Sequence, residues 1–171
     1  MKNAVVILVG GKGTRIQHIL PNLPKPLAPI CGRPFLGWII DFLVKQGVDD
    51  IIFSAGYRSE QIKAFIGKIN KKELRMCCVD EEAPLGTAGG VLNALDSSKA
   101  VFENVLILNG DSLTLTELDP LFKSFSDPSI GVSMVGVKVQ DASRYGTLAI
   151  KEGNFLGGFE EKKPGRGLIN A

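Results

Sequence analysis

The sequence has few of the residues that hold small secreted or metal-dependent domains together. Its 171 residues include 3 cysteines, 1 histidine and 1 tryptophan. Cys31 and the adjacent pair Cys77 and Cys78 cannot form a disulfide framework, and the CxxC spacing of a zinc site is absent. We therefore expect a reduced protein of the cytoplasm.

An excess of charge of one sign and long apolar runs are also missing. The 20 Lys and Arg residues oppose 18 Asp and Glu residues, which leaves a formal net charge of +2 and gives no reason to expect a nucleic-acid partner. No apolar run approaches the roughly 20 residues of a membrane span, and the short run 4–9 lacks the cleavage site of a signal peptide. The sequence predicts a globular protein with no membrane partner and enough residues for one domain.

Short β-rich runs alternate with helical stretches along the chain. Strands are expected at 5–9, 51–53, 74–79, 105–108 and 130–139, helices at 35–47, 59–69, 87–95 and 118–125, and a hairpin at 147–150 and 154–159. This alternation predicts an α/β three-layer sandwich with a mostly parallel, Rossmann-like sheet and helices on both faces. We treat residues 1–171 as a single domain, and the strand-like ending 167–171 predicts a chain truncated at its C-terminus.

The loop after the first predicted strand is rich in glycine. Glycines let the backbone N–H groups approach phosphate oxygens closely. Ile16 stands where a dinucleotide-binding fingerprint needs glycine, and Lys12 is followed by glycine where a P-loop needs Ser or Thr. The loop therefore matches neither common phosphate loop, and a strand-to-helix turn without ligand is the alternative. Its candidate nucleotide-binding residues are Gly10, Gly11, Lys12, Gly13, Thr14 and Arg15.

Two further segments contain charged side chains that could help to bind phosphate groups. Prolines on both sides of Lys25 restrict the backbone and aim one ammonium group. Together with Arg15, this lysine would suit a triphosphate, although an incidental lysine on a stiff loop is the alternative. Asn109 and Asp111 follow the fourth predicted strand, at the sheet edge where α/β proteins bind ligands. For Asp111 the alternative is an Asx turn or a helix cap.

Three acidic residues, Asp80, Glu81 and Glu82, precede the glycine-containing segment 84–90. A carboxylate there could accept hydrogen bonds from both N1–H and N2–H of guanine. Thymine and uracil offer a single ring N–H at that edge, and cytosine offers none. We therefore expect GTP, with Glu82 or Glu81 as the acceptor, and a solvated acidic turn is the alternative.

The order and spacing of these motifs resemble the signature of the sugar-phosphate nucleotidylyltransferases. The resemblance covers the whole chain through segments 10–15, 24–27, 32–36, 84–90, 109–111, 145–146, 159–162 and 168–171. In detail the sequence is most similar to the branch of D-glycero-α-D-manno-heptose 1-phosphate guanylyltransferases. The resemblance implies a fold of the nucleotide-diphospho-sugar transferase type. It also implies that this chain lacks the family's C-terminal region, which carries a second metal-binding aspartate.

The resemblance also implies a reaction and roles for particular residues. A nucleotidyl group would pass from a nucleoside triphosphate to a sugar 1-phosphate of the heptose or mannose type, with Mg²⁺ bound by Asp111 and pyrophosphate released. Arg15 would hold the leaving pyrophosphate, and Lys25 would stabilise the reacting phosphates. Gly86 and Thr87 match the loop that lies against the nucleobase. The residues implied for the sugar phosphate are Gly146, Glu161, Lys162 and Asn170.

Other functions stay open at this point. The enzyme could be a thymidylyl-, cytidylyl- or uridylyltransferase acting on glucose 1-phosphate, or the chain could be a non-catalytic domain that senses nucleotide or sugar phosphate. The joint presence of Arg15, Lys25 and Asp111 favours an enzyme, since binding alone needs no phosphate clamp beside a metal-binding carboxylate. Ile16 argues against a dinucleotide-dependent oxidoreductase. A homo-oligomer is compatible with the sequence.

Overall fold

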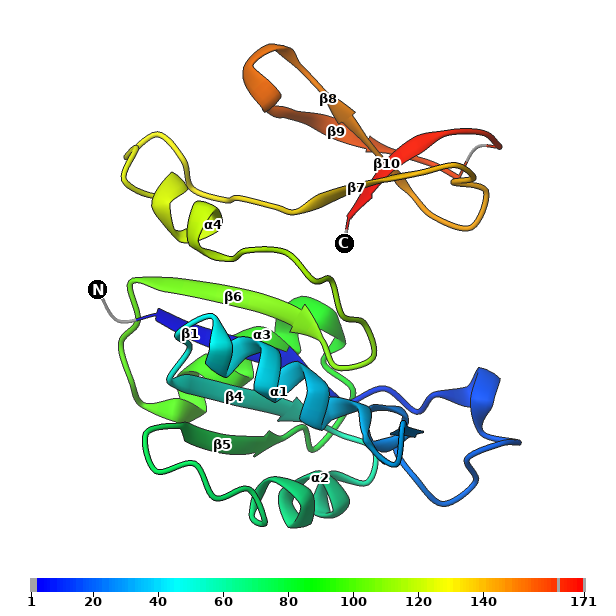
Figure 1. The fold of residues 1–171 in the computed structure, drawn as a ribbon, viewed down its shortest axis with the longest axis vertical. Helices are drawn as coiled ribbons and strands as arrows, with labels where there is room; N and C mark the ends of the chain where they lie inside the picture. The colour runs from blue at the N-terminus through cyan, green and yellow to red at the C-terminus, as the bar shows by residue number, and fades with distance from the viewer. Residues whose placement is uncertain (1–2, 163, 171) are drawn as a thin grey trace. The chain divides into compact units, whose positions relative to one another are not determined.

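The computed structural model describes residues 3–162 and 164–170 (Figure 1). The chain divides into two compact units, Met1–Leu115 and Thr116–Ala171, called here the N-terminal and the C-terminal unit. Within the described residues, no helix is long and apolar enough to cross a membrane.

The N-terminal unit contains a four-stranded parallel sheet. Its strands are β1 (Asn3–Leu8), β4 (Asp50–Ala55), β5 (Arg75–Asp80) and β6 (Asn104–Asn109), in the order β5-β4-β1-β6. The central strands β1 and β4 are almost entirely buried, which agrees with the apolar runs 4–8 and 51–53 that they contain. The predicted parallel α/β sheet is confirmed, and each predicted strand in this unit lies within two residues of an observed one.

Three helices flank this sheet, as the alternating pattern predicted. They are α1 (Phe35–Lys45), α2 (Ser59–Ile66) and α3 (Gly86–Ser98). Figure 1 shows α1 in front of the sheet and α3 behind it. Val91 and Ala94 of α3 pack with Val6 and Ile52 of the sheet in one buried apolar cluster. The helices therefore cover both faces of the sheet, and the loops lie at the carboxyl ends of its strands.

Short elements lie in these loops, and two of them carry Arg15 and Lys25. They are the 3-10 turns η1 (Thr14–Ile16) and η2 (Lys25–Leu27) and the two-residue strands β2 (Pro29–Ile30) and β3 (Arg33–Pro34). Pro24 precedes η2 with an extended backbone, and Pro26 lies inside the turn. The prolines thus confine the backbone on both sides of Lys25, as expected from their fixed φ.

The C-terminal unit contains a short helix and two small antiparallel sheets. Its elements are α4 (Asp119–Ser124), β7 (Gly136–Val139), β8 (Thr147–Ile150), η3 (Glu152–Asn154), β9 (Leu156–Glu160) and β10 (Gly167–Asn170). Strands β8 and β9 form the predicted hairpin, and β10 pairs with β7. The predicted strand at 130–139 is wrong over residues 130–135, because the pairing with β10 extends only over Gly136–Val139.

Candidate active site

A cavity of about 550 Å³ opens beside the carboxyl ends of β1 and β6, within the N-terminal unit. This volume falls within the range of small-molecule sites. The predicted nucleotide-binding and catalytic residues that line the cavity are Gly10, Gly11, Gly13, Thr14, Arg15, Lys25, Gly86, Thr87, Asn109 and Asp111. Segments that lie far apart in the sequence therefore meet around one space.

The loop between β1 and η2 forms one wall of this cavity. Gly13 has a left-handed backbone with φ +61°, a conformation that glycine adopts without a steric penalty. A Cβ at this position would lie 3.3 Å from Cβ of Lys25. Gly13 thus turns the chain into η1, which carries Arg15, and keeps the turn close to Lys25.

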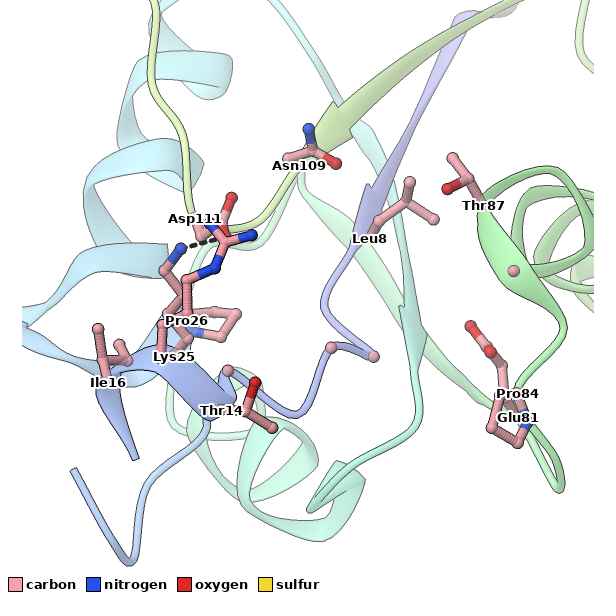
Figure 2. A pocket seen from close by; sticks show the side chains of 15 residues that line it. Leu8, Thr14, Ile16, Lys25, Pro26, Glu81, Pro84, Thr87, Asn109 and Asp111 are labelled. Carbon is pink, nitrogen blue, oxygen red and sulfur yellow. Dashed lines mark hydrogen bonds and ion pairs between the residues drawn. The ribbon is translucent and has the colours of Figure 1, made fainter. Parts of the chain in front are cut away.

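Lys25 and Asp111 face each other at one end of the cavity. Nζ of Lys25 lies 2.6 Å from Oδ2 of Asp111 (Figure 2). The N–H of Gly110 donates to the carbonyl of Leu8 at 2.9 Å, which ties the loop after β6 to the end of β1. The neighbouring parallel strands thereby place the aspartate beside the lysine.

Glu81 lies on the other side of the cavity. Figure 2 shows Glu81, Pro84 and Thr87 on the opposite side of the cavity from the Lys25–Asp111 pair. The buried hydroxyl of Ser54 donates to Oε1 of Glu81 at 2.8 Å, and the N–H of Leu85 lies 3.3 Å from Oε2. Both oxygens of this carboxylate are therefore held by donors of the protein.

Gly90 of α3 provides the space for this arrangement. A Cβ there would lie 2.7 Å from Oε1 of Glu81 and 2.9 Å from Oγ of Ser54. Any larger residue would have to displace the carboxylate or the hydroxyl. The close approach of the α3 backbone is thus part of how Glu81 is positioned.

The structure separates the three acidic residues at the end of β5. Asp80 forms an ion pair with Lys63, and this hydrogen bond lowers the pKa of the Asp80 carboxyl. Glu82 is exposed and does not line the cavity, whereas Glu81 does. Of the two expected acceptors, Glu81 lines the cavity and Glu82 does not, and the contact of either with a base stays a prediction.

One expectation for this region differs from the structure, and one residue of the site was not predicted from the sequence. Lys12, expected at the phosphates, is exposed and is not among the lining residues. Ser54 was not singled out from the sequence, although a hydroxyl residue at the carboxyl end of an otherwise apolar strand was a signal for it. Ser54 is buried, with 1% of its surface exposed, so it cannot be found by looking for polar residues in surface loops.

Few side chains at the cavity could bind Mg²⁺. Within 3–162 and 164–170, no three His, Cys, Asp or Glu side chains form a group that could hold a metal. Asp111 alone offers a carboxylate at the cation-lined end of the cavity. Proteins commonly bind Mg²⁺ through one or two carboxylates together with substrate phosphates and water. The residues present therefore fit a Mg²⁺ ion that arrives with a phosphate substrate.

The residues expected at the sugar phosphate belong to the C-terminal unit. Gly146 directly precedes β8, and Glu161 and Lys162 directly follow β9. Because Thr147 pairs with Glu160, these three residues lie at the same end of the β8–β9 hairpin. Asn170 lies on β10 opposite Gly136. Their contact with a sugar stays a prediction.

Comparison with known proteins places these observations in a family. The family model described as nucleotidyl transferase matches residues 4–166. The D-glycero-alpha-D-manno-heptose 1-phosphate guanylyltransferases of Aneurinibacillus thermoaerophilus and Campylobacter jejuni are 34% and 35% identical over 96% of this chain, which covers 70% and 72% of those proteins.

A solved structure gives the same result for the fold. The crystal structure of HddC from Yersinia pseudotuberculosis complexed with GMP-PN aligns with a TM-score of 0.78 and 34% identity, covering 99% of this chain and 74% of that one. Sequence and fold therefore agree over nearly the whole chain. The chain belongs to the nucleotidyl transferase family.

Proposed function

We propose that this protein transfers a guanylyl group from GTP to a sugar 1-phosphate of the heptose type, giving a GDP-sugar and pyrophosphate. The observation that carries the proposal is the cavity itself, with cations and a glycine-rich loop at one end and the doubly held carboxylate of Glu81 at the other. Relatives named as heptose 1-phosphate guanylyltransferases support the same reaction.

The chemistry needs alignment and charge neutralisation more than covalent help from the protein. An oxygen of the sugar phosphate attacks the α-phosphorus of GTP, and the bond from that phosphorus to the β-phosphate oxygen breaks. Arg15 would hold the departing pyrophosphate, and Lys25 would stabilise negative charge that develops on the reacting phosphates. Holding both substrates in line replaces a slow bimolecular encounter by a reaction within one complex.

Asp111 would hold Mg²⁺ in this scheme. When bound, the ion would neutralise phosphate charge and so stabilise the transfer. In the structure described here, Asp111 accepts a hydrogen bond from Lys25 instead. The triphosphate oxygens would attract the ammonium group of Lys25, which would leave the carboxylate of Asp111 free to bind the metal.

Glu81 would select the base. An ionised carboxylate has about four acceptor positions, two on each oxygen. Ser54 uses one on Oε1 and the Leu85 N–H uses one on Oε2, which leaves one on each oxygen. Guanine offers two adjacent donors, N1–H and N2–H, which match this remaining pair. Adenine would instead turn the lone pair of its N1 toward the carboxylate.

The C-terminal unit would contribute the sugar-phosphate contacts. Lys162 would bind the phosphate, while Gly146, Glu161 and Asn170 would bind the sugar, as the family resemblance implies. We propose that the reaction belongs to nucleotide-sugar biosynthesis for cell-surface polysaccharides and takes place in the cytoplasm, which supplies nucleoside triphosphates. A homo-oligomer is compatible with this assignment.

Pyrophosphate release tests the proposal directly. We expect Mg²⁺-dependent release from GTP with heptose 1-phosphate, and much less with dTTP, UTP, CTP or ATP or with glucose 1-phosphate. Preference for another nucleotide or for glucose 1-phosphate would contradict the assigned specificity. Saturable GTP binding without turnover, with any of the sugar 1-phosphates, would instead indicate a sensing domain.

The variant Glu81→Gln tests whether Glu81 selects the base. Glu81→Gln replaces a double acceptor by an amide that presents one donor and one acceptor, so the KM for GTP should rise about tenfold or more. The preference for GTP over ITP, which lacks the 2-amino group, should fall in parallel. Glu82→Gln is the matched control, since Glu82 is exposed and outside the cavity lining. A change with Glu82→Gln and none with Glu81→Gln would reverse the assignment.

A further inference from the structure

The turn between β4 and α2, residues 56–58, contacts the loop that carries the cations. This β1–η2 loop, residues 9–24, includes Arg15 and leads directly into Lys25. Most of it lies outside regular secondary structure, so its shape depends on contacts with the rest of the unit. The contacts with residues 56–58 are spread along its length.

Tyr57 makes the contacts near the beginning and the middle of the β1–η2 loop. Its backbone N–H donates to the carbonyl of Gly10 at 3.2 Å. Its hydroxyl accepts a hydrogen bond from Nε2 of Gln17 at 3.4 Å. The first glycine and the segment directly after η1 are therefore both connected to the same turn.

Arg58 makes the contacts near the end of the loop. Its Nη1 donates to the carbonyl of Asn22 at 2.7 Å, and its Nη2 donates to the carbonyl of Pro21 at 3.1 Å. Nε2 of Gln61, one helical turn further along α2, also donates to the Asn22 carbonyl at 3.1 Å. One planar guanidinium thus holds two successive carbonyls, three and four residues before Lys25.

The backbone of Arg58 is itself unusual. It adopts a left-handed conformation, with φ 56° and ψ 41°, immediately before α2. This region disfavours residues other than glycine, and such conformations persist where surrounding contacts hold them. The hydrogen bonds from the guanidinium to the β1–η2 loop are contacts of this kind, and glycine could not supply them.

We propose that Arg58 is a positioning residue that clamps the end of the β1–η2 loop and thereby fixes Arg15 and Lys25 for the triphosphate. The clamp is a property of the chain alone, whereas its effect on the triphosphate rests on the proposed function. Arg58 is not among the residues that line the cavity, so it would act through the loop without touching the substrate.

Limited proteolysis without nucleotide tests the clamp. Arg58→Gly removes the guanidinium but keeps a residue that adopts the left-handed backbone without strain. Trypsin cleavage after Lys12 and Arg15, followed by mass spectrometry, should become about tenfold faster, because loop opening loses two hydrogen bonds that resist it. Lys68→Ala removes an exposed cation two residues after the end of α2 and should leave the cleavage rate unchanged. Equal cleavage of Arg58→Gly and the unaltered protein would overturn the clamp.

Kinetics on the same variants tests the consequence for the substrate. Arg58→Gly should raise the KM for GTP about tenfold and leave the KM for the sugar 1-phosphate unchanged. Arg58→Lys should not restore the KM, because an ammonium group lacks the planar fork that reaches both carbonyls. A fully restored KM in Arg58→Lys, or one unchanged in Arg58→Gly, would overturn the positioning role. If the unaltered protein shows no turnover while cleavage still depends on Arg58, the proposed function fails and the clamp stands.

Discussion

Lys25 and Asp111 form an ion pair although their side chains keep 41% and 35% of their surface exposed. Ion pairs at this level of exposure contribute about 0–1 kcal/mol to folding. Such a pair is easily opened, so a phosphate substrate can take over the ammonium group. The same residues can therefore matter greatly for catalysis and little for stability.

Lys25→Ala separates these two contributions. We expect kcat/KM for nucleotidyl transfer to fall about 100-fold or more, because a preorganised donor to developing charge is lost. The free energy of unfolding should change by less than about 1 kcal/mol. Pyrophosphate release and urea denaturation measure the two effects on the same preparation.

Lys123→Ala serves as the matched control for this variant. Lys123 pairs with Asp119 at 2.7 Å, and both side chains are exposed, so this variant also breaks a surface lysine–aspartate pair. Turnover should be unaffected. If Lys25→Ala kept full turnover, or if Lys123→Ala lost as much, the role assigned to Lys25 would be wrong.

The meeting of Lys25, Arg15 and Asp111 could be predicted because the carboxyl ends of parallel strands share one edge of a sheet. The choice between Glu81 and Glu82 could not. The two residues are consecutive in the sequence, directly after β5. The positions of Ser54 and Gly90 determine which of them lines the cavity. The role of Arg58 could not be predicted either, because its partners are backbone carbonyls, which have no sequence signature.

At the scale of elements, apolar periodicity was sufficient for the sheet of the N-terminal unit and for the helices around it. The predicted strand at 130–139 shows where this reasoning fails. Alternation of apolar residues indicates which faces a strand would have, but a strand also needs a partner. Only Gly136–Val139 has one, in β10, which lies about 30 residues later in the chain.

Helix α3 combines a structural role with the positioning of Glu81. Glycine inside a helix usually costs about 0.5–1 kcal/mol relative to alanine. Gly90→Ala should therefore favour the helix, yet its Cβ would lie 2.7 Å from Oε1 of Glu81. We expect the KM for GTP to rise about tenfold and the preference for GTP over ITP to fall, since the carboxylate must move.

Ser97→Ala is the comparison for Gly90→Ala, because Ser97 is exposed on the same helix. It changes helix propensity without adding an atom beside Glu81, so nucleotide preference should stay as it is. Steady-state kinetics with GTP and ITP distinguishes the two variants. An unaltered preference in Gly90→Ala would mean that the carboxylate does not read the base.

At the scale of the whole molecule, the family model extends across both compact units, while the cavity of the candidate active site is lined entirely by residues of the first. The sequence could assign residues to each substrate from the family motifs. The predicted hairpin already indicated that Gly146, Glu161 and Lys162 lie toward one end, but its register, with Thr147 opposite Glu160, came only from the structure. The two substrates should therefore affect different parts of the chain.

Hydrogen exchange measured by mass spectrometry on the full chain tests this division. GTP with Mg²⁺ at 100 times its dissociation constant stabilises the binding-competent state by about 2.7 kcal/mol, so amides that exchange through opening of the site should slow up to about 100-fold. This protection should fall on segments 9–27, 81–91 and 109–111. Heptose 1-phosphate should protect segments 145–148 and 159–162, since Lys162 would bind its phosphate. If the sugar phosphate protected only the N-terminal unit, the residues assigned to it on the hairpin would be wrong, and the acceptor would bind beside Lys25 and Arg15.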